Sequence, residues 1–236
     1  MVMPPLIALE QATVLRGGRA VLRDASLSLG MGERVGLLGD NGAGKTTVMR
    51  ALVGLEPLSA GRLTAFGQSP KSEADFVAVR AKAGFLFQDP DDQLFSPTVI
   101  EDVMFGPLNL GATPSEARAT ARDTLDRLQL SSLADRITHH LSGGEKRLVA
   151  LACVLAMQPL VLLLDEPTNA LDRSARERLI TVLRGLDQAM LVVSHDLGFL
   201  ADITTRVVAL EGGRVWPATL HQHATVTPHL HIDRRI

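Results

Sequence analysis

The chain alternates between short apolar runs typical of β-strands and longer stretches whose apolar residues recur at helical spacing. The runs at 160–166 and 189–195 are hydrophobic almost throughout, as is typical of parallel strands covered on both faces. Two more runs flank the turn 16–19, which predicts an antiparallel pair near the N-terminus. Strands are expected at 6–15, 20–29, 33–38, 160–166, 189–195 and 206–215, and helices at 45–55, 114–130 and from after Ser142 to about Met157.

Composition adds that the chain can bury a real core. Of its 236 residues 46% are hydrophobic, which suits one large domain or a core with a smaller subdomain. Lys and Arg number 24 against 26 Asp and Glu, and a net charge of −2 offers no long-range attraction for nucleic acid. Nucleic acid is therefore not expected as a partner. The single cysteine, Cys153, lies in an apolar helical run and is expected to be a core residue in a reducing compartment.

No segment is expected to insert directly into a membrane. The N-terminus lacks a basic region followed by a long apolar stretch, so no signal peptide is predicted. The most apolar segment, 148–164, is interrupted by Gln158 and Pro159, and each half is too short to span a bilayer. Any role at a membrane would be exercised from outside the lipid.

The sharpest motif is GDNGAGKT at 39–46, which matches the phosphate-loop pattern G-x-x-x-x-G-K-[ST] between an expected strand and an expected helix. Its glycines let backbone N–H groups surround a phosphate at a helix N-terminus. Lys45 would neutralise phosphate oxygens and the Thr46 hydroxyl would ligate Mg²⁺. A ligand-free glycine-rich turn would not need this Lys-Thr pair. The expected nucleotide-binding residues here are Gly39, Asp40, Asn41, Gly42, Ala43, Gly44, Lys45, Thr46 and Thr47.

Polar residues also follow the apolar runs 160–166 and 189–195. Asp165 ends the first run, at the sheet edge where open parallel sheets bind ligands. We expect Asp165 to hold Mg²⁺, Glu166 to orient or deprotonate the attacking water, and His195 to contact the γ-phosphate. A strand-end histidine satisfied by local hydrogen bonds is the alternative for His195. The shared sheet edge favours the functional interpretation.

Between the phosphate loop and Asp165 the chain is much longer than a simple βαβ unit, so a mostly helical segment is inserted there. Near its end, Ser142 and Glu145 form the S-x-x-E pattern of a capping box. Gly143 and Gly144 lie between them, although glycine is a poor helix former and is not needed for a cap. Their N–H groups at a helix N-terminus suit an anion site.

The segments GDNGAGKTT, LSGGEKRLVALACVLAM, LLLDEPTNALD and SHD occur in the order and spacing of an ABC-transporter ATPase, which the chain resembles over residues 6 to about 215. The resemblance implies a P-loop NTPase (RecA-like) core with a mostly parallel sheet, an N-terminal antiparallel β portion and an inserted helical subdomain. It also implies a head-to-tail dimer, in which each ATP lies between the phosphate loop of one subunit and the signature of the other. The family's signature matches Ser142, Gly143, Gly144 and Glu145. Its Q-loop glutamine matches Gln88, and its switch histidine matches His195. The loop that crosses the dimer interface matches 169–172, which ends at Asp172.

By this resemblance, residues 1–92 and 158–215 form the ATP-binding core, 93–157 the helical signature subdomain, and 216–236 a weakly ordered tail. The tail contains His221, His223, His229 and His231. A nickel or cobalt site is one interpretation of these imidazoles. Without cysteine or regular spacing, a solvated terminus is favoured.

Two positions depart from the family pattern. Arg16 stands where an aromatic residue usually stacks on adenine, and the chain contains no tyrosine. The base is expected on the Arg16 guanidinium or on aliphatic side chains, with weak selectivity for ATP over GTP. Glu145 stands where glutamine is usual, as it does in similar ATPases of uptake systems.

Segments 87–111 and 141–157 are most similar to the ATPase of energy-coupling-factor importers, and FGPLNLG at 105–111 favours the cobalt or nickel branch. The resemblance implies ATP-powered uptake from the cytoplasmic face of the membrane. The partners would be a second copy or a related ATPase, a transmembrane coupling subunit and a substrate-binding membrane subunit. A vitamin importer, such as one for biotin, is an alternative. A soluble ABC-type ATPase of translation or DNA repair is disfavoured, because such proteins usually carry two cores, coiled coils or basic patches.

The acidic loop after the apolar run 85–88 could contact a nucleotide, hold a metal or face a partner. Gln88 is expected to reach Mg²⁺ or water when ATP is bound. The aspartates at 89, 91 and 92 are not needed as metal ligands, and prolines fix a projecting loop. We expect 89–103 to line a groove for coupling helices of the membrane subunit, with the aspartates facing basic residues there. A solvated acidic surface is the alternative.

Overall fold

In the computed structural model, which describes residues 4–220, the N-terminal apolar runs form the antiparallel pair β1 (Ile7–Arg16) and β2 (Arg19–Leu29). Gly17 and Gly18 join them with positive φ, as a tight hairpin turn requires. On the other edge of β1 lies β4 (Ala60–Ala65), also antiparallel. The small sheet therefore has the order β2-β1-β4.

The larger sheet has six strands in the order β5-β6-β7-β3-β8-β9, and all neighbours are parallel except the pair β8 and β9. The strands are β3 (Arg34–Leu38), β5 (Ala83–Leu86), β6 (Val161–Asp165), β7 (Ala189–Val193), β8 (Arg206–Glu211) and β9 (Arg214–Ala218). The predicted α/β class with a mostly parallel sheet and an N-terminal antiparallel β portion is confirmed.

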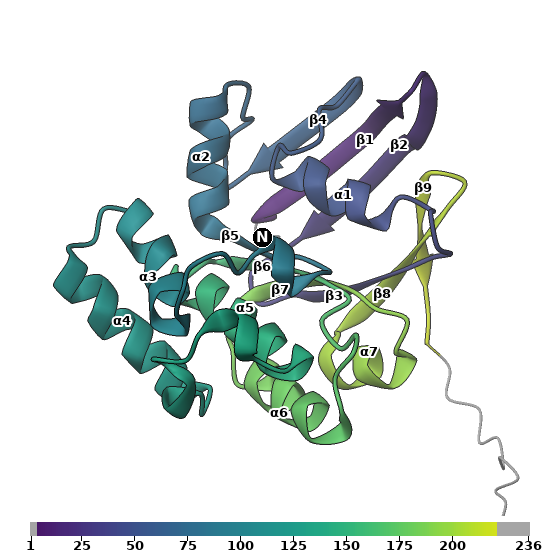
Figure 1. Ribbon diagram of the computed structural model, residues 1–236. Helices are drawn as coiled ribbons and strands as arrows, with labels where there is room; N and C mark the ends of the chain where they lie inside the picture. Colours follow the sequence, from purple (N-terminus) through teal and green to yellow (C-terminus); the bar gives the residue numbers. More distant parts are fainter. Residues whose placement is uncertain (1–3, 221–236) are drawn as a thin grey trace, which may run out of the picture.

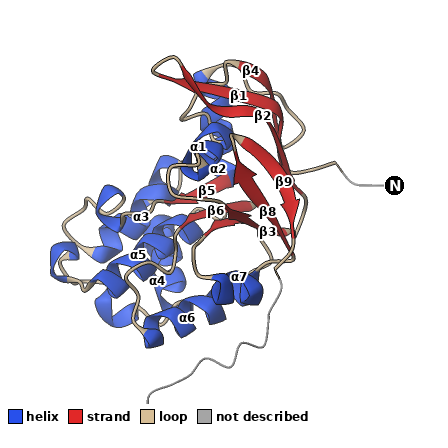
Figure 2. Cartoon of the chain, turned by 90° about the vertical axis from the view of Figure 1, so that its right-hand side faces the viewer, coloured by secondary structure: helices blue, strands red, loops and turns tan. Residues whose placement is uncertain are grey.

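The helices are α1 (Lys45–Leu52), α2 (Glu73–Lys82), α3 (Val99–Asn109), α4 (Pro114–Arg127), α5 (Gly143–Ala156), α6 (Arg173–Arg184) and α7 (Leu197–Ile203), with one-turn 3₁₀ helices at Pro90–Asp92, Ser131–Leu133 and Thr138–His140. Figures 1 and 2 show α1 between the two sheets, while α5, α6 and α7 cover the opposite face of the larger sheet. Helices α3 and α4 lie to the side and pack on α5. No helix within residues 4–220 is long and apolar enough to cross a membrane.

The central strands are apolar throughout because they serve two cores. On β6, Val161 and Leu163 pack with α1 and the small sheet, whereas Leu162 and Leu164 pack with α5, α6 and α7. The four side chains are fully buried. Burial on both faces is the expected consequence of a parallel sheet covered by helices, so the strands at 160–166 and 189–195 are confirmed.

Element ends differ from the prediction where residues take left-handed backbone. The helix expected at 114–130 ends at Arg127, and Gln129 has a φ of 58°. The helix expected at 45–55 ends at Leu52, two residues before Gly54 with a φ of 73°. Such φ values end a right-handed helix.

The run at 206–215 was expected to be one strand, but it forms the hairpin β8 and β9, with a turn at Gly212 and Gly213. Residues 216–218, expected in the weakly ordered tail, belong to β9 and pair with β8. That tail boundary is therefore wrong. The four tail histidines lie outside the described residues. Cys153 packs against the core as expected, and burial raises the pKa of its thiol, with the charge of Asp102 acting in the same direction.

Candidate functional site

The phosphate loop connects β3 to α1, and its glycines adopt conformations that other residues rarely take. Gly44 is the N-cap of α1 with a φ of 105°, and a Cβ there would lie 2.9 Å from Val21 Cγ1. Gly39 has a φ of 148°, and its Cβ would lie 2.6 Å from the carbonyl oxygen of Leu210. No side chain caps α1, so its first N–H groups are left for a ligand. The loop is shaped to receive an anion.

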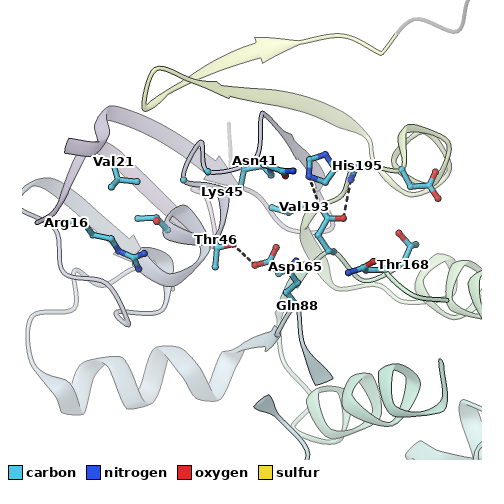
Figure 3. Close-up of a pocket in the computed structure, with 16 residues that line it drawn as sticks. Arg16, Val21, Asn41, Lys45, Thr46, Gln88, Asp165, Thr168, Val193 and His195 are labelled. Atoms are coloured by element: carbon cyan, nitrogen blue, oxygen red, sulfur yellow. Dashed lines mark hydrogen bonds and ion pairs between the residues drawn. The ribbon is translucent and has the colours of Figure 1, made fainter. Parts of the chain in front are cut away.

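Lys45 and Thr46 carry the loop's chemistry. The Lys45 ammonium is buried and donates to the carbonyls of Gly39 and Asp40, at 2.7 and 2.9 Å from Nζ, so its charge lies within the loop. The Thr46 hydroxyl donates to Asp165 Oδ2 at 2.8 Å (Figure 3). This bond joins the first turn of α1 to the end of β6, 119 residues away in the chain.

Asp165 is a buried carboxylate suited to a cation. Burial raises its pKa, although the hydrogen bond from Thr46 and three neighbouring basic side chains act in the opposite direction. A bound cation would favour its ionised form. Gln88 lines the same cavity, so hydroxyl, carboxylate and amide oxygens are available together, and Mg²⁺ prefers oxygen ligands. Within residues 4–220 no cluster of three or more His, Cys, Asp and Glu could hold a metal, so this ion would also need phosphate oxygens or water.

Glu166 and His195 face each other beside that carboxylate. Glu166 has a φ of 48°, a conformation that costs a non-glycine residue about 1–2 kcal/mol. Its amide donates to the Val193 carbonyl at 2.9 Å, and its Oε2 accepts from the amide of His195 at 3.2 Å. The other oxygen, Oε1, is buried 3.3 Å from His195 Nε2 and makes no well-aligned hydrogen bond with the described residues. Glu166 therefore keeps an acceptor for a proton.

A cavity of about 640 Å³ brings these residues together (Figure 3). Of the predicted residues, those that line it are Arg16, Asn41, Gly42, Gly44, Lys45, Thr46, Thr47, Gln88, Asp165, Glu166 and His195. Gly39, Asp40 and Ala43 belong to the same loop but do not line the cavity. Figure 3 places Arg16 and Val21 beside the phosphate loop, and Asp165 and His195 across the cavity from Arg16.

Prediction did not place five lining residues in the nucleotide cavity: Val21, Thr168, Asn169, Val193 and Asp196, of which Asn169 was expected only in the dimer loop 169–172. Thr168 and Asn169 come directly after the Asp-Glu-Pro segment, and Asp196 follows His195, so proximity in sequence was an available signal. Val21 lies on β2 and reaches the cavity through the sheet. The alternation of polar and apolar residues along β2 gives no indication that Val21 lines a site.

Arg16 is fixed by an ion pair. Its Nε lies 3.2 and 3.1 Å from the two carboxylate oxygens of Glu56, and its Nη2 also binds Oε2. Glu56 follows α1 in a loop that Ser59 ties to β1 through a 2.8 Å bond to the Thr13 carbonyl. The side chain of Glu56 is 13% exposed and that of Arg16 is 48% exposed. The guanidinium plane is therefore held at the rim while much of it stays open.

The predicted signature residues and Asp172 do not line this cavity. The capping box is confirmed: Ser142 Oγ accepts from the Glu145 amide, and the Glu145 carboxylate accepts from the Ser142 amide at 2.8 Å. A Cβ on Gly143 would meet nothing within 4 Å, so the helix start is open on that side. Asp172 caps α6 by accepting from the Ala175 amide at 2.8 Å.

The acidic loop makes contacts that the sequence did not indicate. Asp89 accepts from the Asp91 amide at 2.9 Å and begins the 3₁₀ turn. Asp91 binds Lys146 of the same chain at 2.6 Å while its side chain is 63% exposed, and the expectation that the aspartates face basic residues of another subunit stays a prediction. The apolar side of the loop does line a groove of about 280 Å³, where Phe95 and Phe105 meet edge to face.

A protein-family model of ABC transporters matches residues 22–169. A protein of Brucella suis biovar 1, provisionally named an ABC transporter ATP-binding protein, is 56% identical over 98% of this chain and 96% of its own. The cobalt import ATP-binding protein CbiO of Rhodobacter capsulatus is 46% identical over 90% of this chain and 78% of its own.

Solved structures agree on the fold. The cbiO1 protein of Clostridium perfringens, described as part of the ABC transporter complex cbiONQ, superposes with a TM-score of 0.81 at 32% identity, covering 90% of this chain and 87% of its own. The ATP-binding cassette MJ0796, in a dimeric post-hydrolysis state bound to ADP and Pi, has a TM-score of 0.80 at 27% identity, over 89% of this chain and 96% of its own.

Proposed function

This chain belongs to the ABC transporter family of ATP-binding proteins and is an ATPase, and from that premise we propose that it powers an energy-coupling-factor importer of a transition-metal ion. The observation that carries the proposal is the single cavity that gathers Lys45, Thr46, Asp165, Glu166 and His195. Cobalt is the first candidate cargo and nickel the second. The support for this choice is the similarity to the cobalt import protein CbiO and to cbiO1.

The cavity can hold ATP by its phosphates. The N–H groups at the start of α1 and the ammonium of Lys45 would bind the β- and γ-phosphates. Thr46, Asp165 and Gln88 would hold Mg²⁺, which when bound neutralises charge that develops on the phosphate oxygens. The protein's part is to fix the phosphates against the sheet edge where Glu166 lies.

Hydrolysis is assigned to Glu166 as the general base. Its buried Oε1 can accept a proton from a water that attacks the γ-phosphate. His195, 3.3 Å away, would orient that carboxylate and contact the γ-phosphate. The amide of His195 holds Oε2, so the carboxylate is aimed before the water arrives.

The nucleobase is assigned to the open face of Arg16. A planar guanidinium can stack on a purine, and the Glu56 ion pair holds it in place. Stacking does not read the edges of the base. We therefore expect ATP and GTP to bind with similar affinity.

A head-to-tail dimer completes the proposed site. The signature at 142–145 does not line its own cavity, and Gly143 leaves the N-terminus of α5 open for a partner's phosphate. The loop at 169–172, which ends at the α6 cap Asp172, would cross the interface. The dimeric MJ0796 cassette supports this arrangement. The second subunit would be another copy or a related ATPase.

The groove beside the acidic loop is the proposed contact for a transmembrane coupling subunit. Phe95 and Phe105 are 61% and 48% exposed, although large apolar side chains normally favour burial. The buried Asp102 accepts from the amides of Phe95 and Ser96, at 3.1 and 2.8 Å, and so fixes the loop that presents them. Docking there would place the protein at the cytoplasmic face of the membrane, where a substrate-binding membrane subunit completes the complex.

The proposed function also divides the chain into two subdomains. We propose that 1–92 and the segment from 158 through β9 bind ATP, and that 93–157 carries the signature. Helices α3 and α4 pack on one another and on α5, and α5 also packs on β5 of the larger sheet. A vitamin importer with the same ATPase remains the alternative cargo assignment.

Uptake by cells decides the cargo. Deletion of the gene should abolish energy-dependent cobalt uptake, and expression of the chain should restore it, while biotin uptake stays unchanged. Lost biotin uptake with intact cobalt and nickel uptake would assign the chain to a vitamin importer. Unchanged uptake of all three, with co-purification of ribosomes or DNA, would contradict a transport role.

A further inference from the structure

Arg147 connects the first turns of α5 to the loop that carries Gln88. Its Nη1 donates to the Phe87 carbonyl at 2.7 Å and its Nη2 to the Gln88 carbonyl at 2.5 Å. The residue lies on α5, a few positions after the Ser142 cap. One guanidinium therefore links the predicted Q-loop to the predicted signature helix.

The Arg147 guanidinium is buried, which costs desolvation free energy. Arg147 is 3% exposed, and burial lowers its pKa while the charges of Asp89, Asp165 and Glu166 act in the opposite direction. No carboxylate of the described residues forms a salt bridge with it, and its Nε has no hydrogen-bond partner among them. Apolar side chains fill such positions without a desolvation penalty. The two carbonyl bonds thus point to a positioning role.

Two further contacts join the same elements. Lys146 binds Asp91 at 2.6 Å, and Gln93 Nε2 donates to the Ala150 carbonyl at 3.0 Å. Gln93 also accepts from the amide of Phe87 at 3.3 Å. Together with Arg147, these bonds fasten the loop at 87–93 to α5 at several points. The loop at 87–93 and the start of α5 are therefore linked by side chains at both ends of the loop.

We propose that Arg147 is a positioning residue through which nucleotide in a chain's own cavity orders that chain's signature segment, 142–146. The proposal rests on the proposed function, in which this segment acts on the partner's ATP. When the Gln88 side chain engages the bound Mg²⁺ and phosphate, its backbone is held, and its carbonyl holds Arg147 and the start of α5. Coupling free energy is reciprocal, so engagement of the signature would in turn strengthen nucleotide binding in the same chain.

Amide hydrogen exchange tests this in the free monomer, at a concentration where light scattering shows one chain with Mg²⁺ and ATP present. In the wild type, ATP should slow exchange at 142–146 by at least about threefold, because ordering protects amides. Arg147→Met should remove this ATP-dependent slowing. The Kd for ATP is measured for each variant and the slowing is compared at equal occupancy, because Arg147 lines a second cavity with Thr46, Gln88 and Asp165. Arg147→Lys, which replaces the two separate Nη donors by one ammonium on a different stem, should give an intermediate effect.

The matched control is Arg136→Met. Arg136 contacts the same segment through Glu145, at 3.3 Å, but makes no bond to the loop at 87–93. Its substitution should preserve the ATP-dependent slowing. If Arg147→Met fails to fold, Gln88→Ala replaces it, because it removes the side chain that senses nucleotide and keeps the backbone carbonyl.

Three results would overturn the inference: no ATP-dependent slowing in the wild type, full slowing in Arg147→Met or Gln88→Ala, or equal loss in Arg136→Met. Hydrolysis by Ser142→Arg separates this outcome from failure of the proposed function. Normal turnover in that variant would refute the trans site, whereas abolished turnover with intact slowing in Arg147→Met would refute only the role of Arg147.

Discussion

At the scale of single residues, the site depends on side chains whose positions are fixed by unusual local features. Glu166 has a left-handed backbone, anchored by its own amide and by the amide of His195. Strained backbone of this kind persists where the surroundings hold it, and it is concentrated at functional sites. Arg16 is held equally firmly, by a carboxylate rather than by backbone.

Glu166→Gln should lower ATP hydrolysis by about 10²–10⁴-fold, because the amide keeps the shape of the side chain but cannot accept a proton. The Kd for ATP should stay close to that of the wild type. Steady-state phosphate release and equilibrium binding measure the two quantities. Glu177→Gln is the control, since that glutamate lies exposed on α6 and binds Arg173. Near-normal turnover in Glu166→Gln would refute its assignment as the base.

Arg16→Ala should weaken ATP and GTP binding alike, by about 3–30-fold, because it removes the stacking plane from under either base. Binding of inorganic tripolyphosphate should not change. Arg16→Tyr should restore nucleotide affinity, since a ring offers the same kind of plane. Calorimetric titration of the three ligands measures these affinities.

Arg19→Ala, on the same hairpin turn, is the control for loss of a positive charge. If tripolyphosphate binding weakens as much as ATP binding in Arg16→Ala, the residue acts on the phosphates and the base assignment is wrong.

At the scale of elements, two helix N-termini are prepared for anions in different ways. Helix α1 begins at a left-handed glycine without any side-chain cap, whereas α5 begins with the reciprocal bonds of Ser142 and Glu145. The Glu145 carboxylate is turned back onto its own helix, so it serves as a cap and leaves the backbone of Gly143 exposed. Glutamate at this position therefore stabilises α5 directly.

Glu145→Gln should lower the melting temperature at neutral pH by about 1–4 °C, because glutamine still offers an acceptor to the Ser142 amide but loses the carboxylate charge near the helix N-terminus. Bonds from the Ser142 amide and hydroxyl lower the pKa of Glu145 from its ordinary 4.5. A carboxyl whose pKa is lower in the folded state stabilises the fold at pH values above its unfolded-state pKa. This contribution is lost as the pH falls through its folded-state pKa. The difference in melting temperature should therefore shrink below about pH 4.5.

Glu116→Gln makes the same change in the capping box of α4 and should show the same sign, because the Thr113 bonds lower the pKa of Glu116 as well. A wild-type advantage over Glu145→Gln that stays constant across the acidic range would contradict this origin.

Elements defined by local pattern were predictable, and those defined by pairing were not. The capped helix after Thr113, with Pro114 at its first position, follows from local chemistry that the structure retains. The hairpin of β8 and β9 was missed although Gly212 and Gly213, between two strand-like runs, are the same kind of turn signal as Gly17 and Gly18. The positions of the motifs at strand ends placed the residues of the cavity, since parallel strands bring their ends to one edge.

Two contacts, that of Arg147 with the Gln88 loop and that of Glu56 with Arg16, could not be predicted from the sequence for a physical reason. Each joins a loop to an element 40 or more residues away, and nothing in the local pattern of either residue marks its partner. An exposed surface role is the ordinary expectation for both residue types. Only the folded arrangement distinguishes these two from other charged residues.

At the scale of the whole molecule, the two candidate interaction sites lie on different elements but share one loop. The loop after β5 carries Gln88 at the nucleotide cavity and continues to Phe95 beside the apolar groove. A partner seated in the groove would therefore touch the same segment that senses nucleotide. In the same loop, Asp91 is bound to Lys146 within the chain.

Phe95→Asp combined with Phe105→Asp should abolish co-purification with the membrane subunits while hydrolysis by the isolated chain stays within about twofold, because two buried charges would face the partner. Pull-down and phosphate release on one preparation measure both. Trp216→Asp is the control, since Trp216 is 50% exposed on β9, across the molecule from α3 in Figure 1. Retained assembly in the double variant would place the contact elsewhere.

The strand order also determines when the larger sheet can fold during synthesis of the chain. Strand β3, which leads into the phosphate loop, lies between β7 and β8, so both of its neighbours are made only when residues 189–211 have been synthesised. Until then the nascent chain contains the complete phosphate-loop motif, but β3 has no paired strand on either side. Pairing between such distant segments is slow and leaves apolar surface open to aggregation. Nucleotide, which binds only the assembled edge, would then act late in biogenesis by trapping the finished sheet.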